Sequence, residues 1–333
     1  MNLRFPARRI TAGSLVACAV AVGLATRGVS PHLEHVAAQD EGPAASEARR
    51  LESAFARVAE RVSPSVVSIR VEAPLEPSDL QPLLGWVLGE PPGGRVLEGG
   101  ASGFVVHEAG AILTNHHVVE RATRIRVRLG DGRELPGTVI GIDPATDLAL
   151  IRVPARGLRP LRFADVARAR VGDSVLAIGA PLGLETTVTT GVLSAIGRSG
   201  FGLSDIEDYV QTDASIHVGS SGGPLVDLEG NVVGVTTVVI GGAPGLSFAV
   251  SAELAAPVTR QLVAEGRVRR SWIGFEHQDL TPDLAVALGA GAETRGSLVS
   301  AITEDGPAQR AGLEVGDAIT AIDGAPLAER LDL

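Results

Sequence analysis

The most informative stretch of this chain is Gly219-Ser220-Ser221-Gly222-Gly223-Pro224, which lies between predicted strands at 209–211 and 232–237. Glycines let a backbone curl tightly, so that several N–H groups of one turn point at the same spot. An acyl-transfer site needs such donors for its oxyanion, and the expected donors here are the N–H groups of Gly219 and Ser221. Taken alone, the stretch also fits an ordinary Gly-Ser hairpin, so its companions decide between the two interpretations.

A reactive serine needs a base and a residue that orients the base. Two adjacent histidines, His116 and His117, follow an apolar strand pattern, although histidines at a strand end are also common surface residues. Asp147 begins the apolar run 147–150, where its carboxylate can be partly buried. Asp143 stands beside Pro144 and is better explained as a turn residue.

The spacing of apolar residues indicates a mainly β fold. Short apolar runs and turns alternate from Phe104 to Val250 without an intervening helical pattern, which favours closed barrels or a sandwich over a parallel α/β sheet. Strands begin at 66–71, and the segment from Pro74 to Gly100, rich in Pro and Gly, is expected to be a surface loop. A helix is expected at 252–265, stopped by Gly266.

Several motifs in the same order resemble those of the HtrA or DegP-like group of trypsin-fold serine proteases. They are Thr114-Asn115-His116-His117-Val118-Val119, Asp147-Leu148-Ala149, Gln211-Thr212-Asp213-Ala214 and Gly222-Gly223-Pro224. The resemblance runs from about Ser65 to the C-terminus and implies a chymotrypsin-like double β-barrel at 64–266. It selects His117 over His116 as the base, and so implies a catalytic triad of His117, Asp147 and Ser221. It assigns Asp213 a structural role and implies assembly as a homotrimer.

The chain departs from the family pattern within the serine turn. Ser220 stands where the family usually has Asn or Asp, but the oxyanion donors are backbone groups and should survive the change. His217 and Val218 replace an Asn-Pro-like pair. His217 is interpreted as an exposed loop residue, with tuning of activity by pH as the alternative.

Substrate preference follows from the expected pocket. A preference for basic side chains needs an acid six residues before the nucleophile, and that position holds Ser215. Ile216 and Leu246 indicate instead a small apolar pocket. Cleavage is therefore expected after Val, Ala, Leu or similar residues.

The segment 267–333 resembles a PDZ domain. Trp272-Ile273-Gly274-Phe275 is similar to the carboxylate-binding loop of such domains, which receives a peptide C-terminus on backbone N–H groups. The segments 302–308 and 311–319 continue the likeness as strand, short helix, turn and strand. The resemblance implies a PDZ domain that is C-terminally incomplete in this sequence: either the sequence is a fragment, or the domain is incomplete and is expected to bind C-terminal peptides poorly.

The N-terminal segment has the order of an export signal. Arginines at positions 4, 8 and 9 precede an apolar run at 10–25, so residues 1–38 are expected to be a signal peptide or an uncleaved membrane anchor. The single cysteine, Cys18, lies inside this run and leaves the later domains without an internal disulfide. It is interpreted as part of the signal, although its context also resembles a lipoprotein processing box. Residues 39–63 are expected to be a linker and an amphipathic helix, with the helix at 47–62.

These patterns predict a serine endopeptidase that cleaves unfolded or misfolded proteins in the periplasm or cell envelope, as part of protein quality control. The alternative is a catalytically silent chaperone or peptide-binding scaffold. A further hypothesis is a site that needs an activator, with the Gly-rich loop 199–203 as the mobile element. No metal or cofactor is implied. The net charge of -10 and the absence of a basic stripe argue against a nucleic-acid partner.

Overall fold

The computed structural model describes residues 43–74, 96–165, 168–180, 186–217, 219–239 and 245–327. The predicted signal or anchor segment, with its apolar run at 10–25, lies outside the described residues. Among the helices in these ranges, none has the length and apolar character needed to cross a bilayer.

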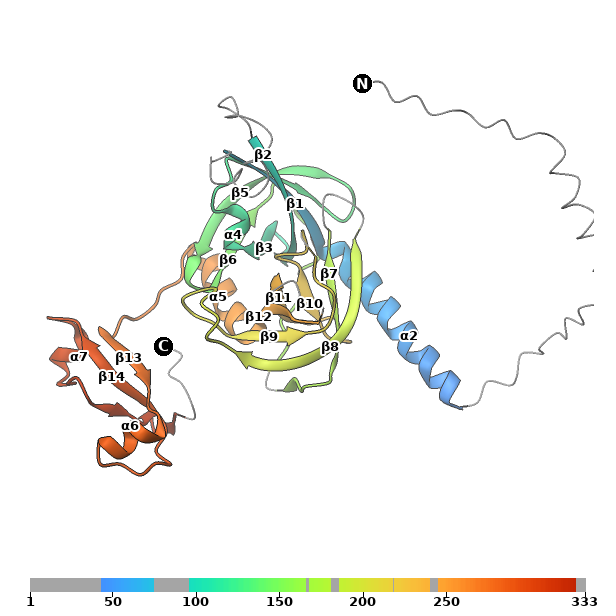
Figure 1. Ribbon diagram of the computed structural model, residues 1–333. Coiled ribbons are helices and arrows are strands. Elements are labelled where there is room, and N and C mark those ends of the chain that lie inside the picture. The colour runs from blue at the N-terminus through green and yellow to red at the C-terminus, as the bar shows by residue number, and fades with distance from the viewer. Residues whose placement is uncertain are drawn as a thin grey trace, which may run out of the picture. The chain divides into compact units, whose positions relative to one another are not determined.

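The first half of the described chain forms a closed barrel of antiparallel strands in the order β1-β2-β3-β6-β5-β4 (Figure 1). Residues of β4 alternate between exposed and buried, as expected for one face packed inside a barrel, whereas all of β3 is buried. The strands are β1 Val66–Pro74, β2 Val96–His107, β3 Ala111–Asn115, β4 Arg124–Arg128, β5 Glu134–Asp143 and β6 Leu148–Arg152.

The second half forms another closed barrel, in the order β10-β11-β12-β9-β8-β7. Its strands are β7 Ser174–Gly179, β8 Thr187–Arg198, β9 Tyr209–Thr212, β10 Pro224–Val226, β11 Val232–Val239 and β12 Ser247–Ser251. The serine turn 219–223 lies between β9 and β10 and is therefore carried by this barrel. The prediction of a mainly β, double-barrel protein is confirmed.

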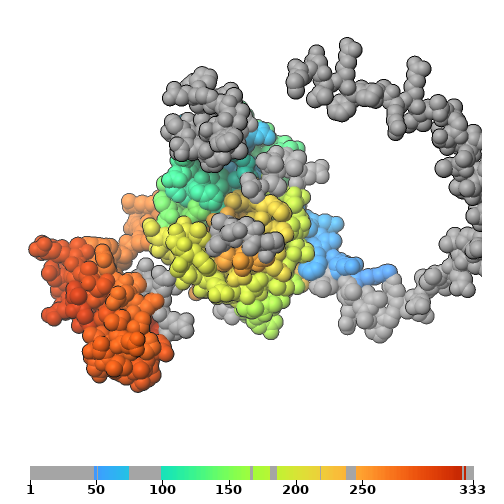
Figure 2. Space-filling model, in the orientation of Figure 1, coloured from blue at the N-terminus to red at the C-terminus, as the bar shows by residue number. Residues whose placement is uncertain are grey.

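The two barrels pack directly against each other. Phe104 and Leu113 of the first barrel share one buried cluster with Leu176 and Phe248 of the second. In the space-filling view the surface of the first barrel, in green and cyan, adjoins the yellow surface of the second (Figure 2). Residues from both barrels can therefore meet in one site at this junction.

Two helices pack against the double barrel. Helix α5, Ala252–Glu265, contacts β5 and β6 of the first barrel and β11 and β12 of the second. Its N-cap is Ser251, whose hydroxyl accepts a hydrogen bond from the Leu254 N–H, and it ends at Gly266 with a left-handed φ of 71°. This helix agrees with its predicted range. Helix α2, Pro43–Val62, buries Val58 and Val62 in the shared core and leads into the 3-10 turn η1, Ser63–Ser65.

Two expectations about boundaries were wrong. Strand β2 begins at Val96, inside the segment expected to be a loop, because residues 96–100 pair with the outer part of β1 from Pro74 to Arg70. Helix α2 begins at Pro43 rather than at 47. Proline is favoured in the first turn of a helix, and the two alanines that follow it have high helix propensity.

The C-terminal segment has its own sheets. Strands β13, β14 and β15 form one sheet in that order, and β16 pairs with β17. The elements are β13 Phe275–Asp279, α6 Pro282–Ala287, β14 Ser297–Ile302, α7 Pro307–Arg310, β15 Ala318–Ile319, β16 Ala321–Ile322 and β17 Ala325–Pro326.

Candidate active site

His117 lies in the short helix α4, His116–Val119, at the point where β3 ends. Its Nδ1 lies 2.7 Å from the Asp147 Oδ2, and its backbone N–H donates to the Asp147 Oδ1 over 2.9 Å. A protonated Nδ1 facing the carboxylate leaves Nε2 free to accept a proton. His116, in contrast, bonds the main chain of Asp147 with its own backbone N–H, over 3.0 Å. The structure thus places the ring of His117 against the carboxylate.

Asp147 is held from several directions. It follows the 3-10 turn η2, Pro144–Thr146, and adopts a left-handed conformation with φ 55°, which is uncommon for a residue other than glycine. Besides the two bonds from His117, its Oδ2 accepts from the Thr237 hydroxyl over 3.1 Å, and its main-chain oxygen accepts from the Asn115 side-chain amide over 3.1 Å. With a side chain only 15% exposed, the carboxylate can orient the imidazole.

Asp143, expected to be a turn residue, directly precedes η2 and is buried. It is more than a turn former. Its carboxylate accepts the Thr146 hydroxyl over 2.5 Å and pairs with both terminal nitrogens of the Arg270 guanidinium, one of them at 2.6 Å from Oδ2. The pair fastens the segment after α5 to the turn that carries Asp147.

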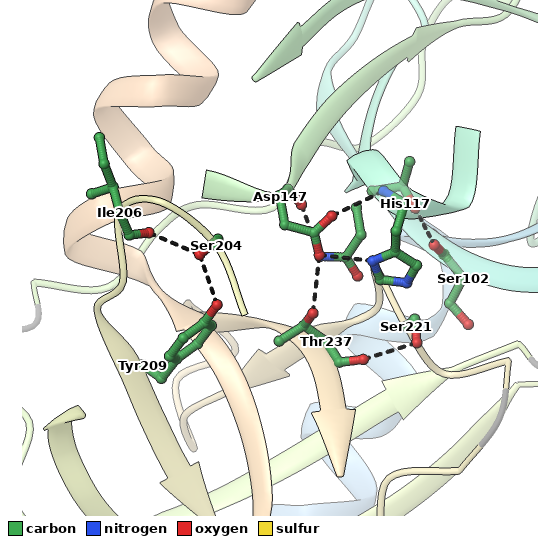
Figure 3. A network of polar contacts seen from close by, with 10 residues as sticks. Ser102, His117, Asp147, Ser204, Ile206, Tyr209, Ser221 and Thr237 are labelled. Atoms are coloured by element: carbon green, nitrogen blue, oxygen red, sulfur yellow. Dashed lines mark hydrogen bonds and ion pairs between the residues drawn. The ribbon is translucent and has the colours of Figure 1, made fainter. Parts of the chain in front are cut away.

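The Ser221 hydroxyl donates to the main-chain oxygen of Thr237 over 3.1 Å. Among the described residues it has no hydrogen bond to His117. Figure 3 shows the resulting arrangement: Thr237 lies between Asp147 and Ser221, with its hydroxyl bonded to Asp147 and its carbonyl bonded to Ser221. The structure therefore joins His117 to Asp147 directly, and joins Ser221 to them through Thr237.

The glycine-rich turn around Ser221 carries the two predicted oxyanion donors, the N–H groups of Gly219 and Ser221. Gly219 has a left-handed φ of 94°, and the Ser220 N–H donates to the His217 oxygen over 2.9 Å. Within the described ranges, the N–H groups of Gly219 and Ser221 donate to no other residue. Two backbone donors of this turn are thus available to a substrate oxygen.

A cavity of about 280 Å³ lies beside the histidine–aspartate pair and is lined by His117, Asp147, Leu203, Tyr209 and Thr237. Sequence reasoning missed Thr237 and Tyr209 as site residues. The only signal for Thr237 was a small polar residue within an apolar strand. Leu203 belongs to the loop 199–203, for which the sequence predicts mobility but no place in the wall of the site.

The loop 199–208 is fastened by Glu207, which is 8% exposed. The carboxylate accepts from the Phe201 N–H over 2.7 Å and from the Leu203 N–H over 2.6 Å. Burial alone would raise the pKa of Glu207, but the backbone N–H groups of the loop outweigh it and lower the pKa. Next to it, burial raises the pKa of the Tyr209 hydroxyl, which is bonded to the Ser204 hydroxyl over 2.9 Å.

The residues expected to form the substrate pocket lie in different surroundings. Ile216 is 7% exposed and packs in the core of the second barrel, whereas Leu246 is 40% exposed. Ser215 is exposed, and its main-chain oxygen accepts the Thr189 hydroxyl over 2.8 Å. The described residues hold no group of three or more His, Cys, Asp or Glu side chains that could bind a metal ion.

The chain matches two family models and several solved structures. The family model of the trypsin-like peptidase domain matches residues 101–235, and that of the PDZ domain matches 298–332. The solved structure of the HtrA-type protease AlgW with a decapeptide is 37% identical, with a TM-score of 0.68, and the match covers 82% of this chain and 86% of that one. The chain belongs to the HtrA family of trypsin-like serine proteases.

The curated relatives of the chain are named as serine endoproteases. A probable periplasmic serine endoprotease, DegP-like, from Brucella suis is 43% identical over 237 residues, which are 70% of this chain and 46% of the relative. The periplasmic pH-dependent serine endoprotease DegQ of Escherichia coli is 36% identical over 284 residues, which are 82% of this chain and 62% of DegQ. The chain thus spans about half the length of the curated relatives it matches.

The predicted carboxylate loop of this HtrA protein leads into β13. Trp272 is 63% exposed and Ile273 37% exposed, and Gly274 has a left-handed φ of 83°. The carbonyls of Ile273 and Gly274 are already used, because they accept from the N–H groups of Ala308 and Thr303 over 2.8 and 2.9 Å. Phe275 begins β13, the strand that follows the loop.

Proposed function

We propose that this chain is a serine endopeptidase in which Ser221 is the nucleophile and His117 the general base. Asp147 orients the base and stabilises its protonated form. The observation that carries the proposal is the 2.7 Å contact of the His117 Nδ1 with Asp147, with Thr237 linking this pair to Ser221. The arrangement supplies the parts that a weakly nucleophilic hydroxyl needs.

In the proposed reaction, the Ser221 hydroxyl leaves the Thr237 carbonyl and gives its proton to the His117 Nε2 as its oxygen attacks the substrate carbonyl. The negative oxygen of the tetrahedral intermediate accepts from the N–H groups of Gly219 and Ser221. His117 then protonates the leaving amine, and the peptide bond breaks to give an acyl-enzyme. Water then gives a proton to His117 as its oxygen attacks the ester, and His117 passes this proton to the Ser221 oxygen as the ester bond breaks and the acid product leaves.

The test is labelling with a fluorophosphonate, which phosphonylates an activated serine, beside a casein digest. Wild type is expected to take up one label per chain at Ser221 and to degrade casein, and Ser221→Ala is expected to do neither. A folded wild-type protein that neither labels nor cleaves would overturn the proposal. The comparisons give no support to the catalytically silent scaffold, because each relative named above is called a protease or an endoprotease.

Unfolded or misfolded proteins of the periplasm are the proposed substrates, and the names of the curated relatives support the compartment. We propose domains at 64–266 for the protease and 267–333 for the PDZ segment, anchoring or export through residues 10–25, and assembly as a homotrimer.

Cleavage is proposed to follow Val, Ala or Leu, with Ile216 and Leu246 as apolar walls of the pocket. Mass spectrometry of the casein fragments tests this preference, and cleavage mainly after arginine or lysine would contradict it.

For the PDZ segment we propose that the loop Trp272–Phe275 binds the free C-terminus of a peptide. The presence of peptides in the AlgW structures supports this class of ligand. Fluorescence anisotropy with a labelled apolar peptide measures the binding, and the same peptide with an amidated C-terminus is the control. Equal binding of the two peptides would exclude recognition of the carboxylate.

A further inference from the structure

Ser102, in β2 of the first barrel, is completely buried, and each of its polar groups has a partner. Its hydroxyl donates to the main-chain oxygen of Gly219 over 2.7 Å and accepts from the Ala180 N–H over 2.9 Å. Its N–H donates to the main-chain oxygen of Ser221 over 2.9 Å, and its oxygen accepts the Thr114 hydroxyl over 2.8 Å. The reaction proposed above uses none of these groups.

These contacts involve Gly219 and Ser221, the two residues whose N–H groups are the expected oxyanion donors. Ser102 holds the carbonyl of Gly219 with its hydroxyl and the carbonyl of Ser221 with its N–H. The carbonyl between them, on Ser220, is held from the second barrel by the Thr236 hydroxyl over 2.7 Å. The Ser221 N–H lies in the same peptide plane as the Ser220 carbonyl, so the Thr236 hydroxyl fixes its direction. Ser102 fixes the neighbouring planes 219–220 and 221–222, so each donor N–H is one Cα away from a plane that Ser102 holds.

Gly219 makes this control necessary. A glycine with a φ of 94° has a wide choice of backbone conformations, so its flanking peptide planes rotate easily unless other groups fix them. The surroundings of Ser102 are also tightly packed: a Cβ added at Gly179 would lie 3.2 Å from the Ser102 hydroxyl oxygen. Removal of the hydroxyl would therefore leave the Gly219 carbonyl and the Ala180 N–H unpaired in a buried place.

Ser102 also connects the serine turn with the strand that leads to the base. Thr114, which donates to the Ser102 oxygen, is in β3, three residues before His117. Figure 3 shows Ser102 on the side of the site where His117 and Ser221 lie. A single residue of the first barrel thus contacts the nucleophile turn of the second barrel and the base-bearing strand of its own.

We propose that Ser102 is a positioning residue for the oxyanion donors of Gly219 and Ser221, acting across the junction of the two barrels. The role rests on the proposed protease function. It predicts that loss of the Ser102 hydroxyl impairs stabilisation of the transition state and leaves the binding of substrate unchanged, because the donors act on charge that develops during the reaction.

The test compares wild type, Ser102→Ala and Ser68→Ala with a peptide substrate and with a peptide boronate, whose tetrahedral adduct on Ser221 places an oxygen at the same donors. Ser68→Ala is the matched control, because Ser68 is a buried serine directly opposite Ser102 on β1. We expect Ser102→Ala to lower kcat by about 10- to 100-fold, to leave KM unchanged and to weaken boronate binding by a similar factor. Ser68→Ala should stay within about twofold of wild type in all three measurements.

Amide exchange keeps the proposal testable if Ser102→Ala is unstable. Deuterium uptake in a folded sample should rise in the segments around Ala180 and 219–223, and not elsewhere, relative to Ser68→Ala. Equal kcat in Ser102→Ala and wild type, a parallel rise in KM, or unchanged exchange in these segments would overturn the positioning role. If wild type itself neither cleaves the peptide nor binds the boronate, the proposed protease function fails and the positioning role fails with it.

Discussion

The Ser221 hydroxyl and the main-chain oxygen of Thr237 are joined by a hydrogen bond of 3.1 Å, and the hydroxyl of the same threonine bonds Asp147. The Ser221 hydroxyl therefore donates to a neutral acceptor on Thr237, the residue whose hydroxyl bonds Asp147. Rotation about the Cα–Cβ bond of Ser221 separates this arrangement from one in which the proton faces the imidazole. The hydroxyl that would react and the carboxylate that would orient the base share one threonine of β11.

Thr237→Val removes the hydroxyl that bonds Asp147 and keeps the shape of the side chain. A hydrogen bond to a charged group contributes about 1.5–3 kcal/mol, so kcat is expected to fall by about tenfold or more with little change in KM. Thr237→Ser keeps a hydroxyl and should retain most of the activity. Steady-state hydrolysis of a peptide checks this, and a Thr237→Val enzyme as active as wild type would show that the bond does not orient Asp147.

Arg270 and Asp143 should be coupled in stability. The Asp143 side chain is 4% exposed and that of Arg270 33%, and both carboxylate oxygens are bonded to the guanidinium. A double-mutant cycle with Arg270→Ala and Asp143→Asn is expected to give a coupling energy of about 1–3 kcal/mol in urea unfolding.

The exposed pair Arg168–Asp165 serves as the control for this cycle, since its side chains are 87% and 66% exposed. Its coupling should lie between zero and about 1 kcal/mol. Equal coupling energies in the two pairs would mean that burial of Asp143 does not strengthen its interaction with Arg270.

The sequence predicts those parts of the site that local chemistry determines. Glycines mark the turn at 219–223, apolar runs mark the strands, and a terminal glycine marks the end of α5. Thr237 and Ser102 could not be found in this way. Their roles depend on which carbonyl or carboxylate faces them across a barrel or between barrels, and no local pattern encodes that pairing.

The contact of Arg270 with Asp143 joins positions 127 residues apart and shows the same limit. From the sequence, Asp143 beside Pro144 is fully explained as a turn former, and Arg270 as one of several arginines in a linker. Only the packing of α5 against both barrels brings the two side chains together. The roles of His117, Asp147 and Ser221 remain predictions that the labelling experiment tests.

Glu207→Gln should make the protein less stable in a pH-dependent way. The folded-state pKa of Glu207 is lowered, so its contribution to stability is fully present above the unfolded value of about 4.3 and is lost as the pH falls through the folded value. The variant is expected to be less stable than wild type by on the order of 2 kcal/mol at pH 7, because the amide replaces a charged acceptor of backbone N–H groups. Urea unfolding from pH 7 to pH 3 checks this: the difference should shrink toward low pH, and a constant difference would contradict it.

Gly222→Ala and Gly132→Ala separate backbone strain from steric exclusion at the nucleophile turn. Both glycines have a left-handed φ, 84° and 87°, so either alanine costs about 1–2 kcal/mol for its backbone conformation. A Cβ at Gly132 meets nothing within 4 Å, whereas a Cβ at Gly222 would collide with the Thr114 hydroxyl and the Ser102 carbonyl.

Urea unfolding should show Gly132→Ala to be about 1–2 kcal/mol less stable than wild type, with normal fluorophosphonate labelling. Gly222→Ala should lose at least about 2 kcal/mol more and label at least tenfold more slowly, because Ser221 must shift to make room. Equal stability and equal labelling of the two variants would mean that the turn moves freely away from Ser102 and Thr114.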